Sequence, residues 1–274
     1  MKISTHIVYI FNRLLNKLFK LKILDTDASI DVLNNSNLSL ARYGDGELNI
    51  MMGGDIHFQK YNAELSLRLK SLIKNNQNKK LLIGIPLAIN TVDGYKKEVK
   101  EFWEMNMDTG RMHWLRWCGL KRQFLNASLT RCYIDYEDKS KSKIWFEKLI
   151  GLWEGKKILI VEGKSSKLGV DNALFSNASE IKRILTPANN AWEKYDTILK
   201  ETLKEAANFD LILASIGPTA TILAEDVSKQ GFRIIDIGHL NLEYNKYLED
   251  NLEILGIATI SSEVYNLQIQ KSII

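Results

Sequence analysis

The chain has 274 residues, of which 45% are hydrophobic and 26% charged, and its net charge is +4. These are globular proportions, and the length suits one large domain or two small ones. Two cysteines without a Cys-x-x-Cys motif exclude a disulfide framework and a structural zinc site, which favours a reducing cytoplasm. The small basic excess contains no Lys/Arg block, so nucleic acid is not an expected partner.

The N-terminal region, residues 1–30, predicts an amphipathic helix with no acidic residue before Asp25. No run in it reaches the ~20 apolar residues that a membrane-spanning helix needs. Two interpretations stay open. The helix packs on its own domain, or residues 1–22 lie on the inner membrane surface as a basic amphipathic helix. Its apolar face comprises Ile3, Ile7, Ile10, Phe11, Leu14, Leu18 and Leu21, and its basic residues include Lys2, Arg13, Lys17 and Lys20.

Six apolar runs predict β-strands in residues 31–274, which we expect to form a single domain. Pro86, Pro187 and Pro218 each follow such a run directly, and proline cannot continue a central strand. Several runs are apolar on both faces, as strands of a buried parallel sheet are. The predicted strands are 38–43, 81–85, 156–163, 181–186, 211–217 and 232–238.

Helical patterns alternate with these strands, at 62–75, 93–107, 189–207 and 218–230. This alternation predicts an α/β fold with a doubly wound, mostly parallel, Rossmann-like sheet and helices on both faces. The tryptophan-rich segment 93–153 is expected to be a helical insertion.

The first predicted strand ends in Arg-Tyr-Gly-Asp-Gly-Glu, residues 42–47. Ligands of open parallel sheets bind beyond the carboxyl ends of the strands. Asp45 and Glu47 are hard oxygen ligands suited to Mg²⁺ or Mn²⁺, and Gly44 and Gly46 let a ligand approach the backbone closely. The alternative is that Asp45 caps a short helix that carries Glu47 in its first turn.

Three further strand ends carry candidate site residues. Gly217, Pro218 and Thr219 form a strand-to-helix junction of the type that binds phosphate, although ordinary capping explains them equally well. His239, Glu243 and Asp236 are candidate general bases, and the sequence does not rank them. Residues 162–169 contain glycine, serine and lysine, but the spacing excludes a P-loop, and no Gly-x-Gly-x-x-Gly, Gly-x-Ser-x-Gly or His-Glu-x-x-His motif occurs.

Taken together, five motifs resemble the GT-D-type glycosyltransferases, a family once classed as a domain of unknown function and found in streptococcal glycan-assembly loci. The resemblance covers roughly residues 35–245. It rests on RYGDGE at 42–47, VEGKSSKLGVDNALF at 161–175, ILTPANNAWEKYD at 184–196, IGPTATILAEDV at 216–227 and IDIGHLNLEY at 235–244.

The resemblance implies a GT-D-type fold and a divalent metal, Mn²⁺ or Mg²⁺, held by Asp45 and Glu47 on the diphosphate of a nucleotide sugar. It places the donor among residues of the five motifs. Arg42 balances charge or binds the diphosphate. The donor-site candidates are Arg42, Gly44, Gly46, Glu162, Gly163, Lys167, Asn172, Gly217, Pro218 and Thr219.

We therefore expect a cytoplasmic enzyme that moves a hexose, glucose by the resemblance, from a UDP-sugar to a lipid-linked or protein-linked glycan acceptor. Such transfer belongs to the assembly of surface polysaccharide or glycoprotein. One alternative is a metal-dependent phosphohydrolase that uses the same carboxylates, and another is a non-catalytic subunit that binds nucleotide sugars. Peripheral membrane contact and a homo-oligomer stay open.

Overall fold

The structure is a computed structural model that describes residues 10–11, 14–15 and 18–254. Much of the predicted N-terminal helix therefore lies outside the described residues, although Ile10, Phe11, Leu14, Leu15 and Leu18 are helical. Within the described part of the chain, no helix is both long enough and apolar enough to cross a membrane.

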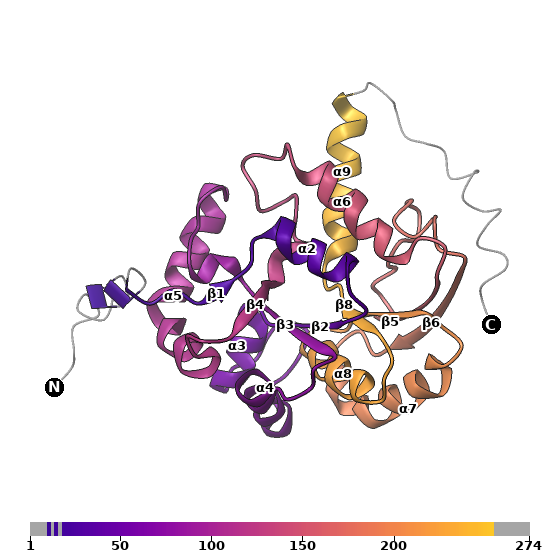
Figure 1. Cartoon of the computed structure of the whole chain (residues 1–274), viewed down its shortest axis with the longest axis horizontal. Helices are drawn as coiled ribbons and strands as arrows, with labels where there is room; N and C mark the ends of the chain where they lie inside the picture. Colours follow the sequence, from indigo (N-terminus) through magenta and orange to yellow (C-terminus); the bar gives the residue numbers. More distant parts are fainter. Residues whose placement is uncertain (1–9, 12–13, 16–17, 255–274) are drawn as a thin grey trace.

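A single sheet of eight strands crosses the middle of the molecule, with every strand pair parallel (Figure 1). Its order is β1-β4-β3-β2-β8-β7-β5-β6. All six predicted strands are confirmed, within two residues at each end. The strands are β1 Lys22–Ile23, β2 Ser39–Arg42, β3 Leu81–Ile85, β4 Gln123–Asn126, β5 Lys157–Gly163, β6 Glu180–Thr186, β7 Leu211–Ser215 and β8 Ile234–Asp236.

Helices cover both faces of this sheet, as predicted (Figure 1). On one face lie α2 Thr26–Asn34, α6 Ser142–Ile150 and α9 Leu240–Ile254. On the other lie α3 Asp45–Met52, α4 Ala63–Asn75, α5 Lys97–Cys118, α7 Tyr195–Ala206 and α8 Pro218–Lys229. Short 3₁₀ turns, η1 Leu87–Ile89, η2 Ala127–Thr130, η3 Gly151–Trp153 and η4 Ala191–Lys194, lie in the connections.

Successive residues of a central strand belong alternately to the two hydrophobic cores, one on each face of the sheet. In β5, Ile158 and Ile160 pack against the α2/α6/α9 layer, whereas Leu159 and Val161 pack against the opposite layer. Successive side chains of a strand point to opposite faces, so a strand covered on both sides must be apolar at every position. This explains why the apolar runs of the sequence were continuous.

Segment 93–153 differs from the expected helical insertion. It contains α5 and α6, but between them it supplies β4, which pairs with β3 and β1 inside the sheet. The strand β4 has four residues and begins with an exposed Gln123, so it contains no apolar run from which a strand could be predicted. The segment is part of the domain's framework.

The crevice of the sheet lies between β2 and β8, which are neighbours although they are far apart in sequence. The chain leaves β2 through α3 toward one face and leaves β8 through α9 toward the other. Connections that diverge to opposite faces open a ligand crevice at the carboxyl ends of the strands. Here the sheet places the Asp45 and His239 regions side by side.

Candidate active site

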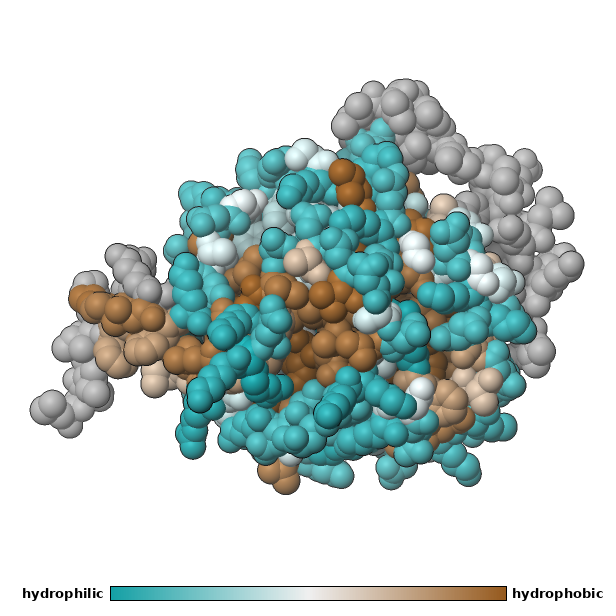
Figure 2. Space-filling model, in the orientation of Figure 1, coloured by the Kyte–Doolittle hydropathy of each residue, from teal (hydrophilic) through white to brown (hydrophobic). Residues whose placement is uncertain are grey.

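A cleft of about 970 Å³ opens at the carboxyl ends of the strands. On the face shown in Figure 2, apolar residues gather in a central hollow that hydrophilic residues surround. The cleft brings together most of the strand ends that the sequence predicted. Of the predicted site residues it is lined by Arg42, Gly44, Asp45, Gly46, Glu47, Gly163, Gly217, Asp236 and His239.

The β2 end directs two carboxylates into the cleft. Gly44 is the N-cap of α3, and its N–H donates to Glu47 Oε2 at 2.6 Å, which fixes the Glu47 side chain in a capping box. The predicted capping role thus falls on Gly44 and Glu47. Asp45, the first residue of the helix, is exposed and lines the cleft. One Glu47 oxygen and the whole Asp45 carboxylate remain available to a ligand.

Three acids share this end of the cleft. Desolvation, the nearby Asp236 and then Asp45 raise the pKa of Glu47 to about 7. The described residues hold no group of three or more side chains placed to ligate a metal. A divalent ion can still bind through one or two carboxylates, with phosphate and water oxygens completing its shell. Asp45 and Glu47 fit that mode, because a cation there would offset a concentration of negative charge.

Arg42 is tied into the framework. Its Nη2 donates to Asp236 Oδ1 at 2.9 Å and its Nε to the Asp236 carbonyl at 2.8 Å. Its Nη1 donates to Thr130 Oγ1 at 2.8 Å and to the Ala127 carbonyl at 3.1 Å. Four of its five N–H groups are therefore used within the fold. Arg42 joins the ends of β2 and β8 to η2, and the predicted diphosphate role has little support from this geometry.

Two of the predicted donor-site side chains at the end of β5 and in the loop after it are engaged within the fold. Glu162 is buried, forms an ion pair with Arg183 and accepts from Leu168 N–H at 2.8 Å. Asn172 bonds to Asn241 and Asn245, at 2.7 and 2.6 Å. Glu162, Lys167 and Asn172 do not line the cleft. The geometry favours loop-holding roles for Glu162 and Asn172 over the predicted donor contacts.

The N-terminus of α8 is covered. A Cβ on Gly217 would lie 2.3 Å from the Phe58 ring, and its φ of +59° also requires glycine. Pro218 and Thr219 are buried and do not line the cleft. Phe58 thus lies in front of this helix end, and of the three predicted junction residues Gly217 lines the cleft, so the geometry gives the predicted phosphate site little support.

The base candidates are separated by the structure. His239 is exposed to the cleft, and desolvation by the cleft walls, with Arg42 and Arg131 nearby, lowers its pKa. Asp236 is engaged by Arg42. Glu243 is fully buried outside the cleft, and its Oε2 accepts from Tyr133 N–H at 3.0 Å and Ile134 N–H at 2.7 Å. The geometry favours His239 as the base and gives Glu243 a structural role.

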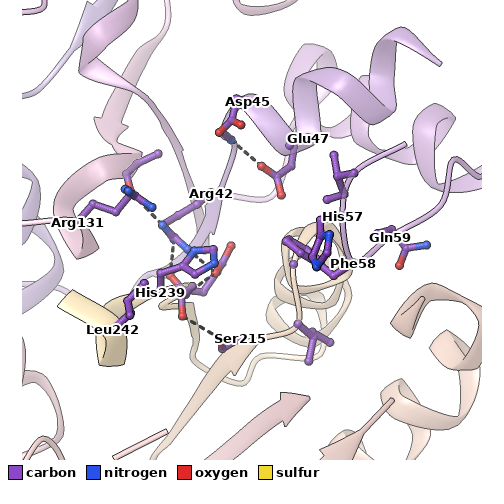
Figure 3. Close-up of a pocket in the computed structure, with 18 of the residues that line it drawn as sticks. Arg42, Asp45, Glu47, His57, Phe58, Gln59, Arg131, Ser215, His239 and Leu242 are labelled. Carbon is purple, nitrogen blue, oxygen red and sulfur yellow. Dashed lines mark hydrogen bonds and ion pairs between the residues drawn. The ribbon is translucent and has the colours of Figure 1, made fainter. Parts of the chain in front are cut away.

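The cleft is also lined by residues that the sequence-based list of site residues did not contain, and three groups of them carry charged or aromatic side chains. Arg131 and Asp135 follow η2, and Figure 3 shows Arg131 on the same side as Arg42 and His239. His57, Phe58 and Gln59 lie on the opposite side. Phe102 and Trp103 of α5 form part of the wall. Arg131 belongs to no motif that a single sequence reveals.

Comparison with known proteins identifies relatives over most of the chain. The family model described as "Glycosyltransferase GT-D fold" matches residues 40–257. The "Probable glycosyl transferase Gly" of Streptococcus gordonii is 37% identical over 225 residues, which is 82% of this chain and 33% of that protein. "Glycosyltransferase GlyD" of Streptococcus pneumoniae serotype 4 is 32% identical over 257 residues, 89% of this chain and 31% of that protein. The chain thus spans about a third of the length of the curated relatives it matches.

Solved structures agree with this fold. One described as "The highly conserved domain of unknown function 1792 has a distinct glycosyltransferase fold" superposes with a TM-score of 0.82 at 35% identity, over 94% of this chain and 88% of that one. Another, described as "A New Glycosyltransferase (DUF1792) from Streptococcus sanguinis", superposes with a TM-score of 0.77 at 33% identity, over 88% of each chain.

Proposed function

Because the chain belongs to the GT-D family of glycosyltransferases, we propose that it transfers a hexose from a UDP-sugar to a glycan acceptor, with Mg²⁺ or Mn²⁺. One observation carries the metal-dependent donor site. Asp45 and Glu47 open into the cleft at the β2/β8 crevice, and neither carboxylate forms an ion pair with a side chain of the described residues. Glucose is the hexose that we expect from the family resemblance.

The chain's own residues divide the work of transfer. Asp45 and Glu47 would hold the divalent ion, which when bound neutralises the charge that develops on the leaving diphosphate. His239 takes the proton of the attacking acceptor hydroxyl, because its lowered pKa keeps the imidazole neutral near pH 7. Arg42 and Asp236 hold the β2 and β8 ends in register, so that the acids and His239 keep their places.

The acceptor would lie along the aromatic wall. Phe102 and Trp103 of α5 meet edge to face, with ring centroids 5.5 Å apart, and Phe102 is exposed. Aromatic rings present flat apolar surfaces, and sugar rings stack on such faces. A glycan, lipid-linked or protein-linked, suits this wall better than a small polar acceptor.

A panel assay tests the function. UDP release from a set of UDP-sugars is measured with and without Mn²⁺, in the presence and absence of lipid-linked and glycopeptide acceptors. Metal-dependent release that requires an acceptor supports the proposal. Equal release without any acceptor would identify a phosphohydrolase, and UDP binding without release would identify a binding subunit.

We further propose that residues 1–22 contact an anionic membrane surface. Ile10, Phe11, Leu14 and Leu18 are each more than half exposed, and Figure 2 shows apolar residues at the edge of the molecule near the N-terminus. Lys20 and Lys22 next to them are exposed and basic. Apolar side chains combined with basic ones favour an anionic bilayer.

Vesicle sedimentation tests the membrane contact. Deleting residues 1–18 should reduce pelleting with anionic vesicles and leave turnover of a soluble acceptor intact. Unchanged pelleting, or a chain that no longer folds, would point to a helix that packs on the protein itself.

A further inference from the structure

Among the described residues that line the cleft, two side chains carry a permanent positive charge, those of Arg42 and Arg131. Arg42 is 14% exposed and uses four of its five N–H groups on the framework. Arg131 is 39% exposed and uses two, both on Asp135. The cation that the cleft can offer to an anionic ligand is therefore Arg131.

Asp135 fixes the orientation of the Arg131 guanidinium. Nε donates to Oδ2 at 2.7 Å and Nη2 to Oδ1 at 2.8 Å, so the two groups meet edge to edge. This bidentate pair occupies one edge of the fork. The other edge keeps three N–H groups, both of Nη1 and one of Nη2, for which the described residues supply no acceptor.

The loop that carries Arg131 is held from two sides. Arg42 donates to Thr130 and Ala127 in η2, directly before Arg131. Glu243 accepts from the backbone of Tyr133 and Ile134, directly after it. The sequence suggested Arg42 as a donor-site residue and Glu243 as a general base, and in the structure both hold the segment that presents this guanidinium.

Electrostatics place Arg131 next to the metal-binding end of the cleft. The pKa of Arg131 is raised first by its hydrogen bonds to Asp135 and further by the charges of Glu243 and Asp45. In Figure 3 it lies on the Arg42 and His239 side, below Asp45. A diphosphate whose oxygens meet a cation at Asp45 would extend toward this edge.

We infer that Arg131 binds the diphosphate of the nucleotide donor through its free edge, a contact that rests on the proposed function. A guanidinium fork matches two oxygens of a phosphate group, which gives direction as well as charge. The contact strengthens as the bond from the sugar to the diphosphate breaks and negative charge gathers on the leaving group. Arg131 is thus a catalytic residue, and Arg42, Asp135 and Glu243 are its positioning residues.

Isothermal titration of three probes tests this inference: UDP, uridine and inorganic diphosphate, each with Mn²⁺. The variants are Arg131→Gln, which removes the charge, and Arg131→Lys, which keeps it without the fork. Arg116→Gln, on the exposed side of α5, is the matched control for the loss of one positive charge.

Arg131→Gln should weaken UDP and inorganic diphosphate by roughly 10- to 100-fold, as expected for hydrogen bonds to a charged group, and leave uridine unchanged. Arg131→Lys should lose more in kcat than in UDP affinity, because a point charge cannot orient the leaving group. Arg116→Gln should behave as the parent protein in every titration.

Separate outcomes overturn separate conclusions. If Arg131→Gln binds UDP as tightly as the parent protein and Arg116→Gln, the Arg131 inference fails and the proposed function stands. The same conclusion follows if Arg131→Gln loses equal affinity for UDP and for uridine. If the unmodified protein binds neither UDP nor inorganic diphosphate, both fail. If Arg131→Gln does not fold, Arg131→Lys decides by the same comparison of UDP with uridine.

Discussion

The loops after β2 and β5 look alike in the sequence and differ in the structure. Each combines glycines with a carboxylate at the carboxyl end of a parallel strand. After β2, Asp45 remains open to the cleft. At the end of β5, Glu162 is paired with Arg183 and with the Leu168 N–H. A strand-end carboxylate is available to a ligand only where the chain supplies no partner for it, and this comparison separates binding loops from closed ones.

The largest effect is expected from substitutions in the loop after β2. Asp45→Asn and Glu47→Gln should each lower transfer by at least about 10³-fold, because a lost metal removes several kcal/mol of transition-state stabilisation. Manganese-dependent UDP binding, measured by titration calorimetry, should disappear. Gln at position 47 can still accept from Gly44 N–H, so the fold should be kept.

Asp55→Asn is the matched control for these variants. Asp55 lies between α3 and α4 and pairs with Lys60, with both side chains at least half exposed. It should leave UDP binding unchanged. Unchanged UDP affinity in both the Asp45 and Glu47 variants would return the pair to helix capping alone.

The next largest effect is expected at the end of β5, and it is an effect on the stability of the fold. Glu162→Ala should lower the free energy of unfolding by about 3 kcal/mol, because it leaves Arg183 without its buried partner. Denaturant unfolding measures this loss. Glu180→Ala, which removes a half-exposed pair with Lys157 on the same strands, should cost at most about 1 kcal/mol. Equal costs would show that the β5 loop is not held by its carboxylate.

A third prediction concerns the β8 end. His239→Ala should lower kcat by roughly 10²-fold with little change in the Kd of UDP, since a base acts in the transition state. His113→Ala on α5 is the control, and Glu243→Gln should keep most of its kcat, because its carboxylate does not reach the cleft. If Glu243→Gln loses the rate and His239→Ala does not, the assignment is reversed.

The pH profile of kcat checks the same residue. Because the pKa of His239 is lowered, the imidazole stays neutral as the pH falls to its ordinary pKa of about 6.5. The acid limb of the profile should therefore lie below pH 6.5 and disappear in His239→Ala.

The smallest expected effect is that of replacing Lys167, a residue of the loop after β5. Lys167 is on the β5 loop and does not line the cleft. Lys167→Ala should change both the unfolding free energy and the free energy of UDP binding by less than about 0.5 kcal/mol, as surface substitutions do. A loss of UDP affinity like that expected for Arg131→Gln would show that the β5 loop contacts the diphosphate.

The sequence was sufficient for most of the fold because the signals of the longer elements are local. Continuous apolar runs ended by proline located β3, β6 and β7, and the alternation with helices gave the layered architecture. β4 and β1 escaped because four and two residues carry too little pattern. Their places depend on pairing with β3, which only the assembled sheet supplies.

The site was less predictable because chemistry depends on partners that are distant in sequence. Asp45 and Glu47 stand at a strand end that the sequence marked. Arg42 and Glu243 also carry charged groups near strand ends, but both are engaged within the fold. Arg42 donates to Thr130 and Asp236, and Glu243 accepts from the backbone of Tyr133 and Ile134. Nothing near Arg131 in the sequence shows that its fork is half free. That property arises only when Asp135 closes one edge.

The place of β8 in the sheet has a consequence for how the protein is made. β8 lies between β2 and β7, so the strand that joins the two halves of the sheet is the last of the described strands to leave the ribosome. Until residues 234–236 emerge, β2 and β7 each have an open edge, and long-range parallel pairing of this kind is slow and prone to aggregation. The Arg42–Asp236 bond forms in the same step. A nascent chain therefore completes its sheet and its candidate active site in the same step, and a chain cut short before β8 completes neither.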